Sequence, residues 1–257
     1  SIVLLIPDKT NTDEKEFISE NIDKVYVEYS SIRNVYANEI ATWFNELRTS
    51  VAAKERWSMT YDNADLASMQ QNKATSAFEQ SVTIARVTTE QKLGFTTGGT
   101  FLFQDKFPVS ETVIGLANSL GTNAIVLPDT ALPPIVGTTF TPSGTATVET
   151  PNGRVKVFLT DSLLSKASEY KVENAAQTSF QRQRLYADTL LIALQLPNVE
   201  RNIIVSPNAY WEPTNEGASV FAASVTGAPW VRNVEAWNVL SKDVSTVERD
   251  NFLNSIA

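Results

Sequence analysis

Short apolar segments alternate along the chain with longer segments that carry apolar residues on one side. Runs of strand length, several of them closed by proline or aspartate, predict strands near residues 2–6, 25–28, 56–60, 100–103, 123–127, 203–205 and 231–236. The run at 2–6 is entirely apolar, which is typical of a parallel strand buried on both faces. The pattern therefore predicts a sheet built largely from buried parallel strands.

Helical patterns fill most of the segments between these strands. The clearest lies at 36–51, where aromatic and aliphatic residues recur at three- and four-residue spacing. We expect further helices at 63–84, with Asn63 as its cap, and at 111–120, 178–195 and 215–225. Ser110 and Gly121 have the residue types that begin and end the second of these helices. Asp161 is expected to open a short helix, and the chain from 241 onward resembles a weak one.

The alternation of strand, polar loop and helix predicts an α/β fold with a parallel sheet. We interpret it as a distorted or incomplete β/α barrel of about six units, and an open doubly wound sheet is the alternative. Asn152-Gly153 separates two alternating runs at 146–149 and 154–159, which indicates an inserted β-hairpin. Since no linker divides the chain, we expect one domain over 1–240, followed by a polar tail or linker at 241–257.

The candidate ligand-binding residues lie where the predicted strands end, because parallel α/β folds place their sites at that edge. They are Asp8, Tyr61, Asp62, Asp65, Asp129 and Trp211, together with Arg182 on the helix at 178–195. Carboxylates bind sugar hydroxyls, aromatic faces stack on sugar rings, and an arginine can hold a carboxylate or phosphate. The competing interpretation makes each aspartate a helix cap and Arg182 part of a solvated face.

Composition narrows the chemistry available to these residues. The chain of 257 residues has no histidine and no cysteine, so it lacks Ser-His-Asp and Cys-His catalysis and the usual zinc ligands. We expect no metal and no cofactor, and we assign no catalytic residue. Paired carboxylates leave one hydrolytic mechanism open. The net charge of −8 disfavours nucleic acid as a partner, because the phosphate backbone is itself negative.

Several segments resemble the motifs of one known protein family. Residues 179–189 (SFQRQRLYADT) are similar to its "ARQRLLAET" helix, and 228–231 (APWV) to its "APWL" motif. Residues 140–143 (FTPS) match "YTPS", and 201–213 (RNIIVSPNAYWEP) follow "R-x-V-V-x-A-P-x-x-x-W-x-P". Residues 61–65 (YDNAD) stand where the family has "Y-G-D-P-D", and they depart from it at 62–64. The likeness extends over about 43–240, and the family that it resembles is an actinobacterial one of secreted, membrane-anchored proteins of unknown function.

This resemblance implies a barrel of the glycoside hydrolase/deacetylase type, in a secreted protein with further domains and a C-terminal membrane anchor. The family's genes often lie beside that of the lipid II flippase, which implies work in the cell envelope. Deacetylases of this type need an Asp-His-His metal site, which a chain without histidine cannot form. We therefore expect a pseudoenzyme: a non-catalytic extracytoplasmic module that binds a cell-wall glycan or an envelope protein. A carboxylate-only glycoside hydrolase and a structural spacer are the alternatives.

Overall fold

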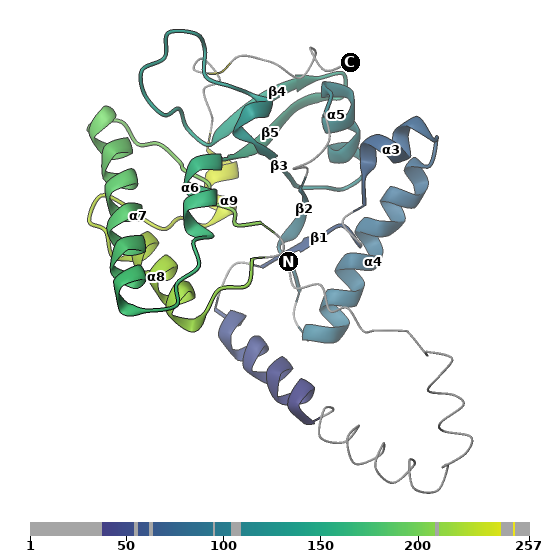
Figure 1. Ribbon diagram of the computed structural model, residues 1–257. Helices are drawn as coiled ribbons and strands as arrows, with labels where there is room; N and C mark the ends of the chain where they lie inside the picture. The colour runs from purple at the N-terminus through teal and green to yellow at the C-terminus, as the bar shows by residue number, and fades with distance from the viewer. Residues whose placement is uncertain are drawn as a thin grey trace, which may run out of the picture.

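The computed structural model describes residues 38–53, 56–61, 64–94, 96–103, 109–208, 211–242 and 249. Its centre is an open five-stranded sheet in the order β1-β2-β3-β5-β4 (Figure 1). The strands are β1 (Trp57–Met59), β2 (Gly99–Phe103), β3 (Ala124–Pro128), β4 (Thr145–Thr150) and β5 (Gly153–Thr160). The first four strands in this order run parallel, and β4 is antiparallel to β5. The predicted α/β class with a mainly parallel sheet is confirmed. The predicted strands at 2–6 and 25–28 lie outside the described residues.

Helices occupy most of the connections between strands. They are α3 (Leu66–Gln71), α4 (Thr75–Leu93), α5 (Glu111–Ser119), α6 (Ser162–Ser168), α7 (Ala175–Gln195), α8 (Asn215–Thr226) and α9 (Ala236–Ser241), with a 3-10 turn η2 (Asp129–Ala131) after β3. A further helix at 38–51, purple in Figure 1, confirms the predicted one, although Ile40 and Trp43 are exposed on it. None of the helices in these described ranges is both long and apolar enough to cross a membrane.

The two faces of the sheet carry different cores because side chains alternate between faces along each strand. One face, with Leu102, Ile125 and Val157, packs against α3, α4 and α5. The opposite face places Phe101 and Phe158 against α9 and the residues before it. Strand β3 is almost wholly buried, as expected of an internal parallel strand.

The hairpin is confirmed. Thr150 and Gly153 form the last pair of the β4–β5 ladder, so Pro151 and Asn152 make the turn. Gly153 has a φ of +110°, which glycine adopts without the steric cost that a side chain would add. The cap and stop predicted around the helix at 111–120 are also confirmed: the Ser110 hydroxyl accepts the N–H of Val113, and Gly121 has a φ of +97°.

Three predicted elements differ from the structure, and one of them, the strand expected at 203–205, is only a single bridge from Ile204 to Thr160. The helix expected at 63–84 is divided into α3 and α4, because the chain turns at Lys73, whose φ is +57°. The strand expected at 231–236 does not form, and helix α9 begins at Ala236 instead. Ala236, Val239 and Leu240 recur at three- and four-residue spacing and pack flat on the sheet, so this segment covers a face of the sheet instead of extending its edge.

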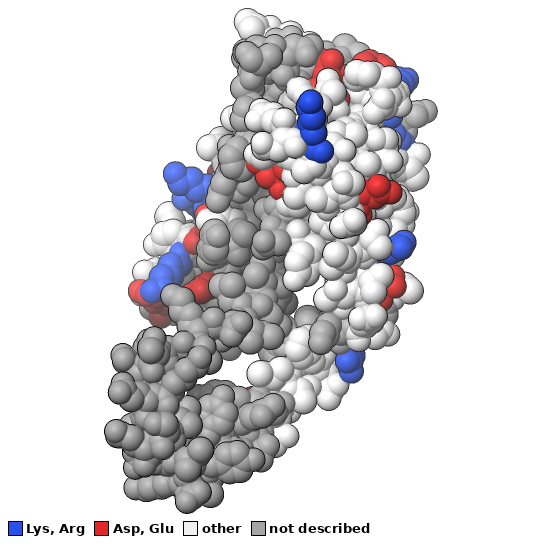
Figure 2. Space-filling view, turned by 90° about the vertical axis from the view of Figure 1, so that its right-hand side faces the viewer, with Lys and Arg blue, Asp and Glu red and all other residues white. Residues whose placement is uncertain are grey.

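Surface charge on the α3–α5 side is mixed. Figure 2 shows acidic and basic side chains interspersed on this face among uncharged residues. Among the described residues in this view, neither sign of charge predominates.

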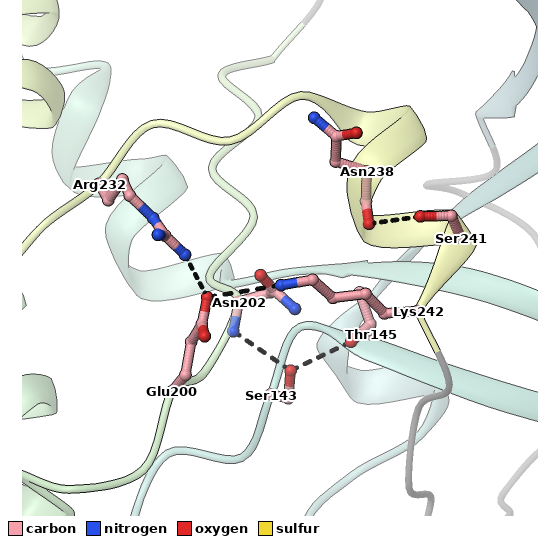
Figure 3. Close-up of polar contacts among 8 residues, drawn as sticks. All are labelled: Ser143, Thr145, Glu200, Asn202, Arg232, Asn238, Ser241 and Lys242. Atoms are coloured by element: carbon pink, nitrogen blue, oxygen red, sulfur yellow. Dashed lines mark hydrogen bonds and ion pairs between the residues drawn. The ribbon is translucent and has the colours of Figure 1, made fainter.

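Polar contacts hold the C-terminal segment beside the loop that enters β4. Glu200 lies between Arg232, at 2.5 Å, and Lys242, at 3.8 Å (Figure 3). In the same region the Ser143 hydroxyl accepts the N–H of Asn202 and lies 3.1 Å from the hydroxyl of Thr145. Segments before β4, after α7 and around α9 are therefore joined at one place.

Candidate functional site

Two aspartates follow neighbouring strands at the carboxyl end of the parallel sheet. Pro128 of β3 pairs with Thr160 of β5, and each is followed directly by an aspartate, Asp129 or Asp161. Both carboxylates interact with the start of α6. Asp129 accepts hydrogen bonds from the Ser162 hydroxyl at 2.5 Å and from the Ser162 N–H at 3.2 Å.

Asp161 is the N-cap of α6 and accepts the N–H of Leu164 at 2.8 Å. Burial raises the pKa of Asp161 above its ordinary value of 3.8, the Leu164 N–H lowers it, and the charge of Asp129 raises it again. The charge of Arg249 has a smaller lowering effect. The outcome is a carboxyl group that keeps its proton to a higher pH than usual, beside a second carboxylate.

Arg249 ties the neighbouring loop to these strand ends. Its guanidinium donates to the carbonyl oxygens of Leu132 at 2.8 Å and of Ser143 at 2.7 Å.

The described ranges contain no group of three or more acidic side chains that could hold a metal ion.

The segment 204–208 runs alongside α6 from the strand ends to the far end of that helix. The Ile204 carbonyl accepts the N–H of Asp161 at 2.8 Å, at the start of α6. The Ser206 N–H donates to the Ser165 hydroxyl at 3.1 Å, and the Asn208 N–H donates to Glu169 Oε1 at 2.7 Å. Because α6 has seven residues, its two ends are separated by about 10 Å.

A surface hollow of about 250 Å³ lies at this far end of α6. We call it the Trp211 hollow. It is lined by Glu169, Tyr170, Lys171, Val172, Asn208, Trp211, Glu212, Pro213, Thr214 and Gly217.

The walls of the Trp211 hollow are fixed by contacts between three segments. Thr214 caps α8 by accepting the N–H of Gly217, and its hydroxyl donates to the carbonyl of Val172 at 2.8 Å. The Trp211 ring meets the edge of Phe221, with centroids 5.6 Å apart. The loop that carries Trp211 is thereby held against both α8 and the chain that follows α6.

The hollow combines aromatic rings with groups that can bind hydroxyls or charges. Tyr170 and Trp211 supply rings, and the Glu212 carboxylate has no hydrogen-bond partner in the part of the chain that the structure describes. Lys171 lies 2.6 Å from the exposed Glu173. This contact raises the pKa of Lys171 and lowers the pKa of Glu173.

The structure separates the residues proposed from the sequence. Asp65 caps α3 through the N–H groups of Ala67 and Ser68. Tyr61 follows β1 and is exposed, and Arg182 is exposed on α7. Asp8 and Asp62 lie outside the described residues. Among the proposed residues that are described, Trp211 alone lines the hollow, and Asp129 belongs to the strand-end pair.

Sequence reasoning missed the contribution of Glu169, Tyr170 and Lys171. The sequence predicted a site at the strand ends, whereas these residues follow the short helix that Asp161 opens. The available signal was the run Glu-Tyr-Lys directly after that helix, which places an aromatic residue between two opposite charges.

Fold and site together define an α/β domain with an open sheet, a carboxylate pair at the strand ends and an aromatic-lined hollow beside α6. The chain belongs to a family of unknown function, DUF6049, whose model matches residues 26–246. The resemblance to an uncharacterised family inferred from the motifs is confirmed to that extent. No curated protein matches the chain in sequence.

Proposed function

We propose that this chain is a non-catalytic binding module of the cell envelope, located outside the cytoplasm, that holds part of a glycan in the Trp211 hollow. The observation that carries the proposal is the presence around one concave surface of Trp211, Tyr170 and Glu212, whose carboxylate has no hydrogen-bond partner among the described residues. Aromatic rings pack on the C–H faces of sugars, and a carboxylate accepts hydrogen bonds from sugar hydroxyls. A structural spacer would not need such a surface.

The size of the hollow limits what it could hold. Pockets for drug-sized ligands have volumes of roughly 300–1,000 Å³, and this one is about 250 Å³. One sugar ring of a longer chain fits this scale better than a whole oligosaccharide. We therefore expect weak binding per site, with specificity for a ring or an end group.

Saturation-transfer NMR with soluble peptidoglycan and arabinogalactan fragments tests the proposal. Trp211→Ala and Glu212→Gln should each weaken the transfer from protein to sugar by at least several-fold. Glu216→Gln is the matched control, since Glu216 is an exposed glutamate on α8 that does not line the hollow. Equal transfer in all variants, or none in the parent protein, would contradict the proposal. Capture of an envelope protein that Trp211→Ala abolishes would replace the glycan as the ligand.

A carboxylate-only glycoside hydrolase is the second candidate, and the strand-end pair favours it. A carboxyl group with a raised pKa beside a second carboxyl group is one feature of the acid–base hydrolysis of glycosides. Release of reducing sugar from cell-wall glycans, lost in both Asp129→Asn and Asp161→Asn, would establish this activity. Binding that depends on Trp211 without any release of sugar would favour the non-catalytic module.

We also infer that the sheet is part of a distorted or incomplete β/α barrel. The parallel strands follow one another across the sheet in chain order: β2 lies beside β1, β3 beside β2, and β5 beside β3. Each new parallel strand is therefore added on the same side of the one before it. Ile204 then bridges Thr160 in parallel, which continues this progression. A doubly wound sheet reverses direction instead. An experimental structure in which residues 2–6 pair beside β1 would support the barrel, and pairing of these residues elsewhere would contradict it.

The location outside the cytoplasm and the membrane anchor rest on the motif resemblance. An alkaline phosphatase fusion to the full-length protein, produced in an actinobacterium, measures this directly. Activity of the fusion is expected, and an inactive fusion would place the domain on the cytoplasmic side.

A further inference from the structure

The solvent side of α7 carries a regular row of side chains. Phe180, Arg184, Ala187, Leu191 and Leu194 follow one another at spacings of four, three, four and three residues. At 100° per residue these positions lie within an arc of about 80° on the helix. We call this row the α7 seam.

Most of the α7 seam is exposed in the part of the chain that the structure describes, although the Phe180 ring also contacts the Tyr170 ring, with centroids 5.6 Å apart. Phe180 is 52% exposed, and Leu191 and Leu194 are each 61% exposed. The opposite side of α7 carries the buried Gln181 and Leu185, which face α6 and α8. Figure 1 shows α7 at the outer edge of the molecule, with α6 and α8 on its inner side. Three large apolar residues exposed on one face of a helix are unusual on a monomer surface.

Alternating spacings of four and three residues are those of a coiled-coil heptad, with Phe180, Ala187 and Leu194 at d positions and Arg184 and Leu191 at a positions. A helix with this pattern packs its row into the row of a second helix nearly parallel or antiparallel to it. We propose that the α7 seam is a dimer interface, in which α7 of a second copy of this chain packs antiparallel to it.

The seam is complementary to itself in the antiparallel orientation. Antiparallel coiled coils place a positions opposite d positions. This register sets Phe180 against Leu191 of the second copy, and Arg184 against Ala187 of the second copy. The small Ala187 leaves space for the long Arg184 side chain, Phe180 and Leu191 form an apolar pair at each end of these central residues, and Leu194 faces Gln177 of the second copy. A two-fold axis between residues 185 and 186 generates every pair twice.

Charge follows the same symmetry. Within one chain Arg184 Nε lies 3.7 Å from Asp188 Oδ2, one helical turn away, and both side chains are partly exposed. In the proposed register Arg184 of one copy lies beside Asp188 of the other, so each guanidinium gains a second carboxylate. A parallel pairing would instead set Arg184 against Arg184 and would be repulsive.

The length of the seam sets the expected strength. From Phe180 to Leu194 the helix rises about 21 Å. Two helices paired over this length bury a surface area at the low end of the range found for specific protein complexes. We expect a reversible dimer with a dissociation constant on the order of 10–100 μM.

Sedimentation velocity over a range of protein concentrations tests the proposal. The parent protein should shift from monomer to dimer as its concentration rises. Leu191→Glu should raise the dissociation constant at least tenfold. Ile84→Glu is the matched control, because Ile84 is 47% exposed on α4 and lies outside the seam; this variant should dimerise normally. Circular dichroism verifies that each variant is folded.

A charge exchange tests the register. Arg184→Asp and Asp188→Arg should each weaken the dimer, and the double variant should recover it, because it restores both intermolecular pairs with their signs reversed. A protein that stays monomeric at all concentrations would overturn the proposal. A dimer that Leu191→Glu leaves intact would overturn it too, and a double variant as weak as the single ones would overturn the antiparallel register.

Discussion

The indole N–H of Trp230 donates a hydrogen bond to the hydroxyl of Thr189 across 3.1 Å. The Trp230 ring also meets the Tyr186 ring edge-on, with centroids 6.0 Å apart. Residues 228–231 and 179–189 are two of the segments that resemble family motifs. Their side chains meet in the described structure, so these two motifs join the segment after α8 to α7.

Replacing Trp230 by phenylalanine removes this hydrogen-bond donor and should lower the free energy of unfolding by about 1 kcal/mol. Thr189→Val removes the acceptor. Since both changes act on one bond, the double variant should lose less than the sum of the single losses, with a coupling of about 0.5–1 kcal/mol. Urea unfolding of the four proteins measures the coupling. A coupling near zero would mean that the contact contributes nothing to stability.

Arg201 belongs to another of the motif segments and binds the C-terminal end of α7. Its guanidinium donates to the carbonyl of Ile192 in the last turns of α7 and to the carbonyl of Thr141 at 2.8 Å. Arg201→Met should therefore cost about 2–3 kcal/mol, since it leaves partly buried carbonyl oxygens without a charged donor.

Arg232→Met is the control for Arg201→Met. Arg232 forms a mostly exposed ion pair with Glu200, and such pairs contribute about 0–1 kcal/mol. The midpoints of chemical unfolding compare the two variants at the same pH and ionic strength. Equal losses would show that the contacts of Arg201 are no more important than a surface ion pair.

The sequence predicted those parts of the fold that local chemistry determines. Asn152-Gly153 predicted the hairpin because asparagine favours turns and glycine adopts the positive φ found at Gly153, and Ser110 predicted the start of α5. The segment at 231–236 was misassigned because a short apolar run fits either a strand or a chain entering a helix. The helix forms because this segment packs on the apolar sheet face of Phe101 and Phe158, and that face exists only in the tertiary structure.

The candidate site was predictable only in part, for a related reason. An aspartate after a strand is equally suited to bind a ligand or to cap the next helix, and Asp65 and Asp161 both act as caps. Trp211 was recognised as an aromatic loop residue. Its neighbours Glu169 and Tyr170 come from a segment about 40 residues earlier in the chain, and only the packing of 204–208 along α6 brings them together.

Lys156 anchors α9 to the sheet. Its Nζ atom donates to the carbonyl oxygens of Leu240 and Lys242, each at 2.5 Å, where α9 ends. Lys156→Met should cost about 1–2 kcal/mol, because these carbonyls lose a cationic donor at the negative end of the helix. Backbone amides of 236–241 should exchange with deuterium faster than in the parent protein. Lys166→Met, an exposed change on α6, should leave this exchange unaltered, and an unchanged rate in Lys156→Met would contradict the anchoring role.

Asp161 should make stability depend on pH in the weakly acidic range. Because its pKa is raised in the folded protein, the native state keeps a proton that the unfolded chain has lost once the pH exceeds about 3.8. The native state then binds more protons than the unfolded state, so this contribution to stability falls as the pH rises through the folded pKa. Asp161→Asn removes the titration, yet its amide oxygen can still accept the N–H of Leu164.

The stability of Asp161→Asn relative to the parent protein should therefore increase as the pH is raised from about 3.8 towards neutrality. Urea unfolding at a series of pH values, at constant ionic strength, measures this difference. Asp65→Asn is the control variant, because Asp65 is also a helix N-cap, at the start of α3. It measures the cost of replacing a cap carboxylate by an amide at a position two strands away from the Asp129–Asp161 pair. A stability difference for Asp161→Asn that stays constant over this range, or that decreases with rising pH, would rule out a raised pKa for Asp161.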